Sequence, residues 1–476
     1  MIADVMASLL YFLGLGYLVQ RGIDLLGSQD RQSMGIGSSP IAPSDLARAL
    51  STRIGLGMLA YTSAITAGLP LRLGFWVGAM GAGLGLLLAA RRPRRRPLVC
   101  QVSPLALAWL GLALALIFTL SMMLPMDVLW ANDARSVWFF HAKIIYFANG
   151  LRADSGWSEP AIRFSHPYYP KLVPILAATE MLRFGYWNEY LPKLALASPL
   201  ACYVLALFAG TRGRASASAL GVTVVALLAT GALLHDGYVD AYTALPAAGA
   251  LWALLRWLSG GHRRDAEHAL VLVGLAMSTK EEGRLFALAL GVGLSPFFLV
   301  RRVRSAAWRF LWSRASLPIF ALALAPALLW SMRAGGFGVH NYLELNLSTK
   351  IRALHRLRTG ALASIMRALI DPASHWFDAA TSAVSGLAAV AGVAKLLGIL
   401  LSRRLRLVTL VCISTGLVYF AELCAVYLMT PYDFGWQLGS SADRVMLVAF
   451  MCLLGVLADA LEDIEDLRLP RRRGSA

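Results

Sequence analysis

Apolar stretches recur along the whole chain and are separated by short polar segments. Most of them are roughly 17 to 25 residues long, the length at which an α-helix crosses about 30 Å of hydrocarbon. This pattern predicts an all-α polytopic membrane protein with about thirteen transmembrane helices. The predicted spans are 3–20, 54–70, 73–90, 103–123, 192–210, 216–234, 238–257, 267–280, 283–300, 316–332, 377–400, 407–429 and 444–460.

Arginine clusters lie in short loops between these stretches. Such clusters beside membrane helices mark the cytoplasmic side. Placing all of them on that side agrees with the alternation of the spans, and it puts the N-terminus outside and the C-terminus in the cytoplasm. The clusters are 91–96, 212–214, 262–264, 301–304, 403–406 and 471–473.

The remaining, extracytoplasmic segments contain most of the residues with chemical interest. They are two longer loops, 124–166 and 334–375, and short turns at 235–240, 279–283 and 430–444. The segment 166–184 is apolar but is interrupted by three prolines. We predict that it stays on the outer side or re-enters under a cover of protein, because irregular backbone is tolerated at membrane depth only there.

The composition supports the membrane class and excludes others. The chain has 476 residues, of which 58% are hydrophobic and 15% charged, with a formal net charge of +17. We exclude nucleic acid as a partner, because the arginines lie in loops next to apolar helices, where they set membrane orientation. The five cysteines have no CxxC spacing, so neither a disulfide framework nor a zinc site is expected.

The first outer loop contains Asp133, the strongest candidate for a catalytic residue. The segment 134–150 that follows is predicted to be helical, and it includes Arg135, Trp138 and His141. A carboxylate held at the outer rim of a bilayer is suited to act as a general base. The alternative is that Asp133 only caps this helix, where the helix dipole favours a negative charge.

Further outer segments add ionisable and aromatic side chains. They contain His166, Pro167, Tyr168 and Lys171; Tyr238 and Asp240; Lys280, Glu281 and Glu282; and Tyr432, Asp433, Asp443 and Arg444. Charges that interrupt apolar sequence need partners or water, so 280–284 implies a polar cavity. The structural alternatives are interfacial anchoring by the tyrosines, helix capping by Asp240 and a salt-bridged helix start at Asp443.

The second outer loop departs from the rest of the outer surface because it is basic. It contains Lys350, Arg352, His355, Arg356, Arg358 and Arg367, with apolar positions near helical periodicity. The segment is either an amphipathic helix lying on anionic lipid or a lid whose arginines clamp a phosphate.

In order, spacing and location these motifs resemble the bacterial membrane glycosyltransferases of the GT-C superfamily, of the protein O-mannosyltransferase and aminoarabinose-transferase type. The resemblance covers roughly 103–460 and rests on 133–135, 166–167, 237–240, 280–283 and 432–444. Two features depart from it. Many relatives have a second acidic residue beside the first aspartate, whereas Asn132 precedes and Ala134 follows Asp133 here, and many have a second proline where Tyr168 stands. Residues 1–100, three extra spans of no assigned role, fall outside it, so we divide the chain into 1–100 and a GT-C-like catalytic domain, 101–476.

The resemblance implies an enzyme of the bacterial inner (cytoplasmic) membrane. The donor would be a polyprenyl-phosphate-linked sugar, and the acceptor a glycan, glycolipid or protein of the cell envelope. Asp133 would act as general base, and Asp240 as a second catalytic carboxylate. No cofactor is required. A divalent metal held by histidines is a minor alternative, because a spacing such as HExxH is missing.

The other candidates divide into two groups around these carboxylates. Cations that stabilise the growing charge on the donor phosphate are needed in place of a general acid. For that role we assign Arg135, His166, Lys171, Lys280, Arg356 and Arg444. Acceptor-binding or cavity-lining residues are Trp138, His141, Tyr168, Tyr238, Glu281, Glu282 and Asp433.

Displacement with a single base predicts inversion at the anomeric carbon. A lipid-linked sugar flippase or transporter is the main competing hypothesis. We see no internal repeat, however, and the polar residues crowd one side instead of the bilayer midplane, where transporters place them. A polymer ligase with a polyprenyl-diphosphate donor stays open, because 334–375 is partly rich in arginine and histidine.

Overall fold

The computed structural model describes residues 2–26, 43–91, 104–129, 131–210, 217–260, 262–314, 316–341, 346–370 and 407–468. Within these residues the chain is helical and contains no strand. The helices are α1 (Ile2–Leu26), α2 (Pro43–Ala67), α3 (Leu71–Ala90), α4 (Pro104–Met123), α5 (Phe139–Phe147), α6 (Leu172–Phe184), α7 (Ala197–Ala209), α8 (Ala217–Thr230), α9 (Asp240–Gly260), α10 (Arg263–Thr279), α11 (Glu281–Leu294), α12 (Arg301–Leu311), α13 (Ser316–Gly336), α14 (Leu347–Arg358), α15 (Ala361–Ile370), α17 (Leu407–Met429) and α18 (Phe434–Arg468).

Seven helical segments of the described chain are long and apolar enough to cross a membrane. They are Ile2–Leu25, Leu71–Ala90, Leu191–Ala209, Glu281–Leu299, Ser316–Gly336, Thr409–Met429 and Phe434–Leu457. This confirms an all-α fold compatible with a polytopic membrane protein. The total of about thirteen spans stays a prediction, and the predicted span 377–400 lies outside the described residues.

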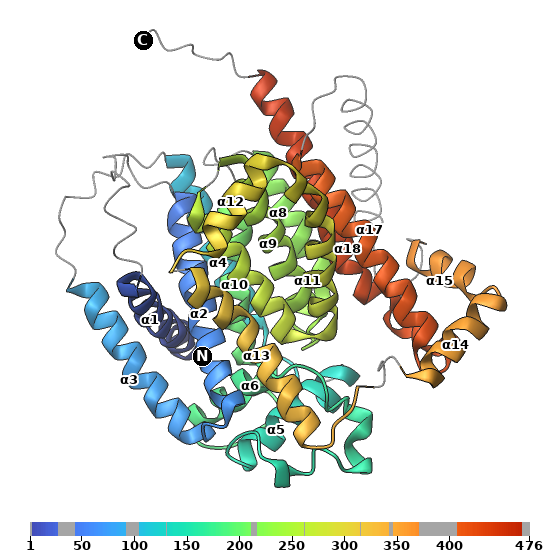
Figure 1. Cartoon of the computed structure of the whole chain (residues 1–476). Coiled ribbons are helices and arrows are strands. Elements are labelled where there is room, and N and C mark those ends of the chain that lie inside the picture. The colour runs from blue at the N-terminus through green and yellow to red at the C-terminus, as the bar shows by residue number, and fades with distance from the viewer. Residues whose placement is uncertain are drawn as a thin grey trace.

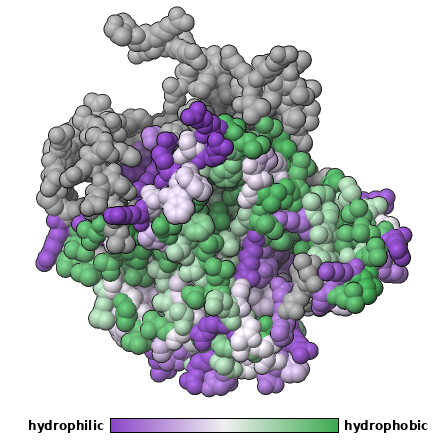
Figure 2. All heavy atoms as spheres, in the orientation of Figure 1, coloured by the Kyte–Doolittle hydropathy of each residue, from purple (hydrophilic) through white to green (hydrophobic). Residues whose placement is uncertain are grey.

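The helical bundle has two distinct ends (Figure 1). The segment between α4 and α6, with α5, covers the lower end, whereas α12 lies at the upper end. In Figure 2 hydrophobic residues dominate the middle of the visible face, and hydrophilic residues gather at the lower end. α6, which contains one of the predicted chain breaks, is buried from Leu172 to Met181, as expected for an element covered by protein.

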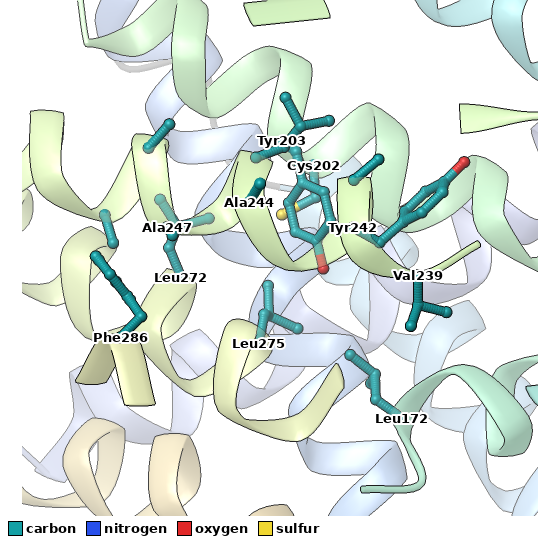
Figure 3. Close-up of a cluster of buried hydrophobic side chains, with 14 of the residues drawn as sticks. Leu172, Cys202, Tyr203, Val239, Tyr242, Ala244, Ala247, Leu272, Leu275 and Phe286 are labelled. Atoms are coloured by element: carbon teal, nitrogen blue, oxygen red, sulfur yellow. The ribbon is translucent and has the colours of Figure 1, made fainter. Parts of the chain in front are cut away.

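The interior is built from α6, α7, α9, α10 and α11 (Figure 3). Tyr203 of α7 and Tyr242 of α9 are fully buried there, with Leu272 and Leu275 of α10. α9 contributes a series of buried alanines, among them Ala244 and Ala247. Because lipid tails are as apolar as the side chains, close packing of small residues holds such helices together.

α2 is part of this main body, although it belongs to the region 1–100 that the family resemblance leaves out. It packs against α7, α10 and α13 as well as α1. Its Ser51 lies 2.9 Å from Nε2 of His268 in α10 and donates to the carbonyl of Cys202 in α7. The four cysteines that the structure describes are buried and form no disulfide with one another.

The predicted start of the last span is wrong. The sequence predicts an outer loop up to Arg444 and a span from that residue, but α18 begins ten residues earlier, at Phe434. Glycine and serine at 435–441 indicate a loop in sequence, yet the segment is helical and contacts α17 through Ser441, whose Oγ lies 2.8 Å from the Tyr427 hydroxyl. Arg444 therefore extends from the middle of a helical surface, and Asp443 is not a helix start.

Candidate functional site

Five charged side chains from four separate segments form one connected network. Arg444 Nη1 lies 2.6 Å from Oδ2 of Asp133 and 3.5 Å from Oδ2 of Asp240. Lys280 Nζ lies 2.7 Å from the other oxygen of Asp240 and 3.0 Å from Glu282. The contact between Arg444 and Asp133 joins residues 311 positions apart in sequence. The network thus contains three carboxylates and two cations.

Breaks between helices place two of these residues. Asp240 is the first residue of α9, and Lys280 is a single extended residue between the end of α10 and the start of α11. The corner at Lys280 requires Gly283, because a Cβ there would lie 1.9 Å from the carbonyl oxygen of Ala276. The start of α9 and the end of α10 both lie at this corner, so Asp240 and Lys280 meet.

A second glycine places Asp133 beside Asp240. Gly237 has φ +87°, in the left-handed region that favours glycine, and a Cβ there would lie 2.9 Å from Cβ of Ala134 and 3.0 Å from Phe139. The turn before α9 therefore packs directly on the π-helix Ala134–Trp138. Asp133 precedes that π-helix in helical conformation and makes no side-chain cap hydrogen bond. The capping alternative is wrong for Asp133.

Asp133 is the most exposed member of the network, followed by Glu282, whose side chain is 15% exposed. The side chains of Asp240, Lys280 and Arg444 are 3%, 6% and 9% exposed, whereas that of Asp133 is 34% exposed. Because of this exposure, Asp133 is the member of the network that a substrate reaches most easily. Removing an ion from water costs several kcal/mol, so the buried ion pairs are weak evidence of a stabilising role.

An aromatic stack lies against these charges. Trp138 stacks on Tyr169 with ring centroids 5.3 Å apart, and Tyr169 stacks on His166 at 5.0 Å. Tyr432 meets His166 edge-on. Burial raises the pKa of the Tyr169 hydroxyl, and the charges of Glu282 and Lys280 also act on it, so the stack borders the network. The sequence prediction includes Trp138 and His166 but misses Tyr169, which the adjacent Tyr168-Tyr169 pair could have indicated.

His166 is part of this stack in an unusual backbone state. Its φ of 52° is rare for a residue other than glycine and implies local strain. Burial, aided by the positive charge of Lys280, lowers the pKa of His166 to about 4, although Asp133 acts in the opposite direction. The imidazole is therefore neutral near pH 7, which weakens its predicted role as a cation for phosphate.

Lys171 and His141 form a separate buried cluster. Lys171 Nζ lies 3.2 Å from Nδ1 of His141 and donates to the carbonyl of Pro167 at 2.8 Å. It also lies over the rings of Trp157 and Trp330. Burial lowers the pKa of both ionisable groups well below their ordinary values. The bond to the Pro167 carbonyl connects this cluster to the turn after His166. Lys171 is 2% exposed, so it does not offer a free cation to a donor.

The other predicted cations also have structural partners or face elsewhere. Arg356 donates to the carbonyls of Tyr427 and Tyr432 and so binds the end of α17. Arg135 is exposed, but positions two apart on a helix do not face each other, so it points away from Asp133. No described residue gives the Arg135 guanidinium a carboxylate partner.

Some of the predicted acceptor and cavity residues lie at the network, whereas others have structural roles elsewhere. Tyr238 lies at the network, with its ring 4.6 Å from Cζ of Arg444. Glu281 pairs with Arg284 at 2.9 Å, next to Glu282. Tyr168 is buried, and its carbonyl accepts from Trp330. Asp433 is exposed and accepts the backbone N–H of Trp436, so its carboxylate caps α18.

The basic outer loop is helical in α14 and α15. Leu347, Ile351 and Leu354 of α14 are at least half exposed. In α15, Leu362, Met366 and Ile370 are 36%, 41% and 62% exposed. Arg352 donates to the carbonyl of Met429, beside the contacts of Arg356. Exposed apolar residues and committed arginines favour the interfacial amphipathic helix over a phosphate lid.

Within the described ranges, no group of three histidine, cysteine or carboxylate side chains is placed to hold a metal ion. No protein-family model, curated protein or solved structure matches the chain. The geometry of the network and of the aromatic stack beside it is therefore the basis for inferring a function.

Proposed function

We propose that the chain is a membrane glycosyltransferase that moves a sugar from a polyprenyl-phosphate donor to an acceptor of the cell envelope. The observation that carries this proposal is the network itself. Three carboxylates and two cations from distant segments meet at one end of the bundle, and one carboxylate is accessible beside stacked aromatic rings. Sugar transfer from a lipid phosphate needs a carboxylate base, cations near the leaving oxygens and a surface for the sugar.

Asp133 is the base in this proposal. The acceptor hydroxyl gives its proton to the Asp133 carboxylate while its oxygen attacks the anomeric carbon. The bond from that carbon to the phosphate oxygen breaks, and the polyprenyl phosphate leaves with the electron pair. A single displacement of this kind inverts the anomeric configuration.

Arg444 couples the two halves of this step. It is shared between Asp133 and Asp240, and its Nε and Nη2 donate to the carbonyl of Ser440, so four of its five N–H donors are already engaged. When Asp133 takes the proton it loses its charge, and its hold on Arg444 weakens. The guanidinium then stabilises the phosphate at the moment when negative charge develops there.

Asp240 and Lys280 keep this arrangement in place. Asp240 binds both cations through different oxygens, and Lys280 also neutralises Glu282. Without the two cations, three adjacent carboxylates would repel an anionic donor. The location of the network at one end of the bundle also supports a transferase over a transporter, whose charged sites lie more often at mid-depth.

The experiment is a transfer assay with the purified chain in lipid nanodiscs. Labelled polyprenyl-phosphate sugars are incubated with a panel of glycan, glycolipid and peptide acceptors. We expect consumption of one donor and a product of inverted anomeric configuration. Net retention contradicts the single displacement. Translocation of the donor across proteoliposomes without transfer to any acceptor would instead establish a flippase.

A further inference from the structure

α12 lies at the end of the bundle opposite to the charged network. It leads through a short turn into α13, whose far end reaches the other side, where Trp330 donates to the carbonyl of Tyr168. Figure 1 shows α12 at the top of the bundle and α5 at the bottom. α13 is one of the candidate membrane spans, so α12 is located where a bilayer surface would begin.

The exposed face of α12 combines arginine and tryptophan. Val303 and Ala307 are buried against the bundle, whereas Arg304, Trp308 and Trp312 follow one another at helical spacing on the outside. Trp308 and Trp312 are 62% and 66% exposed, and their rings pack edge-to-face. In the described part of the chain, the exposed arginines Arg301, Arg304 and Arg309 have no carboxylate partner.

An apolar hollow opens at the corner between α12 and α13. Its volume is about 190 Å³, and it is lined by Trp308, Phe310, Leu311, Trp312, Ser316, Leu317 and Phe320. An apolar protein cavity of about 150 Å³ accepts a benzene molecule. The hollow therefore has room for part of an apolar chain, and the unpaired arginines lie on the same short helix.

We infer that this corner is a binding site for an anionic phospholipid of the adjacent leaflet. One acyl chain occupies the hollow, and the headgroup phosphate meets the arginines of α12. Tryptophan rings belong at the boundary between headgroups and acyl chains, and each arginine close to an anionic leaflet increases binding about fivefold.

Charge argues against a second copy of the chain as the occupant. Two α12 helices facing each other would bring six unpaired arginines together, and like charges across an interface are unfavourable. A phospholipid supplies both of the properties that the corner presents, an apolar chain and a negative phosphate. This site does not depend on the proposed glycosyl transfer.

The test measures lipid bound to the purified full-length chain in neutral detergent by native mass spectrometry. Phosphatidylglycerol and phosphatidylcholine are supplied in equal amounts. We expect the unaltered chain to retain phosphatidylglycerol preferentially, and the triple variant Arg301→Gln, Arg304→Gln, Arg309→Gln to lose at least about tenfold of that preference. The matched control changes three exposed arginines at the opposite end of the bundle, Arg72→Gln, Arg152→Gln and Arg163→Gln, and should keep it.

A second measurement locates the acyl chain. Phosphatidylglycerol with brominated acyl chains quenches the fluorescence of nearby tryptophans. The double variant Trp308→Phe, Trp312→Phe should lose most of the specific quenching, and the protein should stay folded because both side chains are exposed. Full preference in the α12 charge variant, an equal loss in the control variant at the opposite end of the bundle, or unchanged quenching in the tryptophan variant would each overturn the inference. Dimers of the unaltered chain that dissociate in the tryptophan variant would overturn it in favour of a second copy.

Discussion

The helices α9 and α10 carry an arginine–aspartate cluster at each end, and the two clusters differ. At the end opposite to Asp133, Asp265 of α10 lies 2.6 Å from Nη1 of Arg48 and 3.5 Å from Nε of Arg256. Asp45 completes that cluster at 2.7 Å from Arg48. At the other end, Arg444 and Lys280 serve Asp133, Asp240 and Glu282.

The difference lies in charge balance and in the backbone that presents the charges. Asp45, Arg48, Arg256 and Asp265 lie within regular helices, and two arginines match two aspartates. The network at the other end has an excess carboxylate and is built on helix breaks, a π-helix and a strained histidine turn. A buried carboxylate oxygen without a hydrogen-bond partner occurs in both, at Asp265 and at Glu282, so that feature does not separate them.

The same ion-pair chemistry can therefore serve two purposes in one bundle, holding helices together and handling a substrate. A balanced cluster within helices fastens neighbouring helices together. An unbalanced cluster on irregular backbone beside aromatic rings is the arrangement expected where a substrate is handled, because strain and imperfect pairing cost stability and are kept at functional sites.

Asp133→Asn is expected to have the largest effect on turnover, and the same change at Asp45 in the other cluster is expected to have none. Asp133→Asn keeps the shape of the side chain and removes the base, so turnover in the transfer assay should fall about 10² to 10⁴-fold while donor binding is retained. Asp45→Asn, the matched change in the other cluster, should leave the turnover of folded protein unchanged. Near-normal turnover of the Asp133 variant would contradict the role of general base.

Arg48→Met tests the fastening role of the balanced cluster. Asp265 is 1% exposed and loses its closest partner, so the variant should be less stable by about 3 kcal/mol, measured by thermal unfolding in detergent. The same change at Arg444 should lower both stability and turnover per folded molecule. If Arg48→Met reduced turnover per folded molecule as much as Arg444→Met, the distinction between the clusters would fail.

Gly237→Ala tests whether close packing of the turn on the π-helix positions Asp240 beside Asp133. A new Cβ would meet Ala134 and Phe139 at 3.0 Å or less, so we expect a loss of about 2 kcal/mol and reduced turnover. Gly185→Ala is the matched control, because Gly185 has a similar φ of +80° but open space around its Cβ. The two variants should share the backbone strain, and equal losses in both would show that the contact contributes nothing.

His166→Gln gives the smallest effect, through the pH dependence of stability. Because burial lowers the pKa of His166 from 6.5 to about 4, the unfolded chain binds more protons than the folded chain between these values. Stability is therefore complete above about pH 6.5 and falls as the pH drops toward 4. We expect His166→Gln to reduce this acid-induced loss by about 1 kcal/mol, as seen in unfolding temperatures at pH 7 and pH 5. The exposed His355, changed in the same way, serves as the control, and an unaltered pH profile in the His166 variant would refute this account.

The sequence alone indicated the helical membrane class, because the length and apolarity of its stretches are local properties that a membrane imposes directly. It also identified Asp133, Asp240, Lys280 and Arg444 as candidates, since charges are rare in such a chain and each needs a partner. The sequence could not predict which of these residues pair with one another, because their contacts join positions up to 311 residues apart. Only the tertiary structure separated these four from Lys171, Arg356 and Asp433, whose polar groups are committed to aromatic rings, backbone carbonyls and a helix N-terminus. The physical reason is that composition reports how costly a charge is to bury, whereas the packing of distant helices decides which partner offsets that cost.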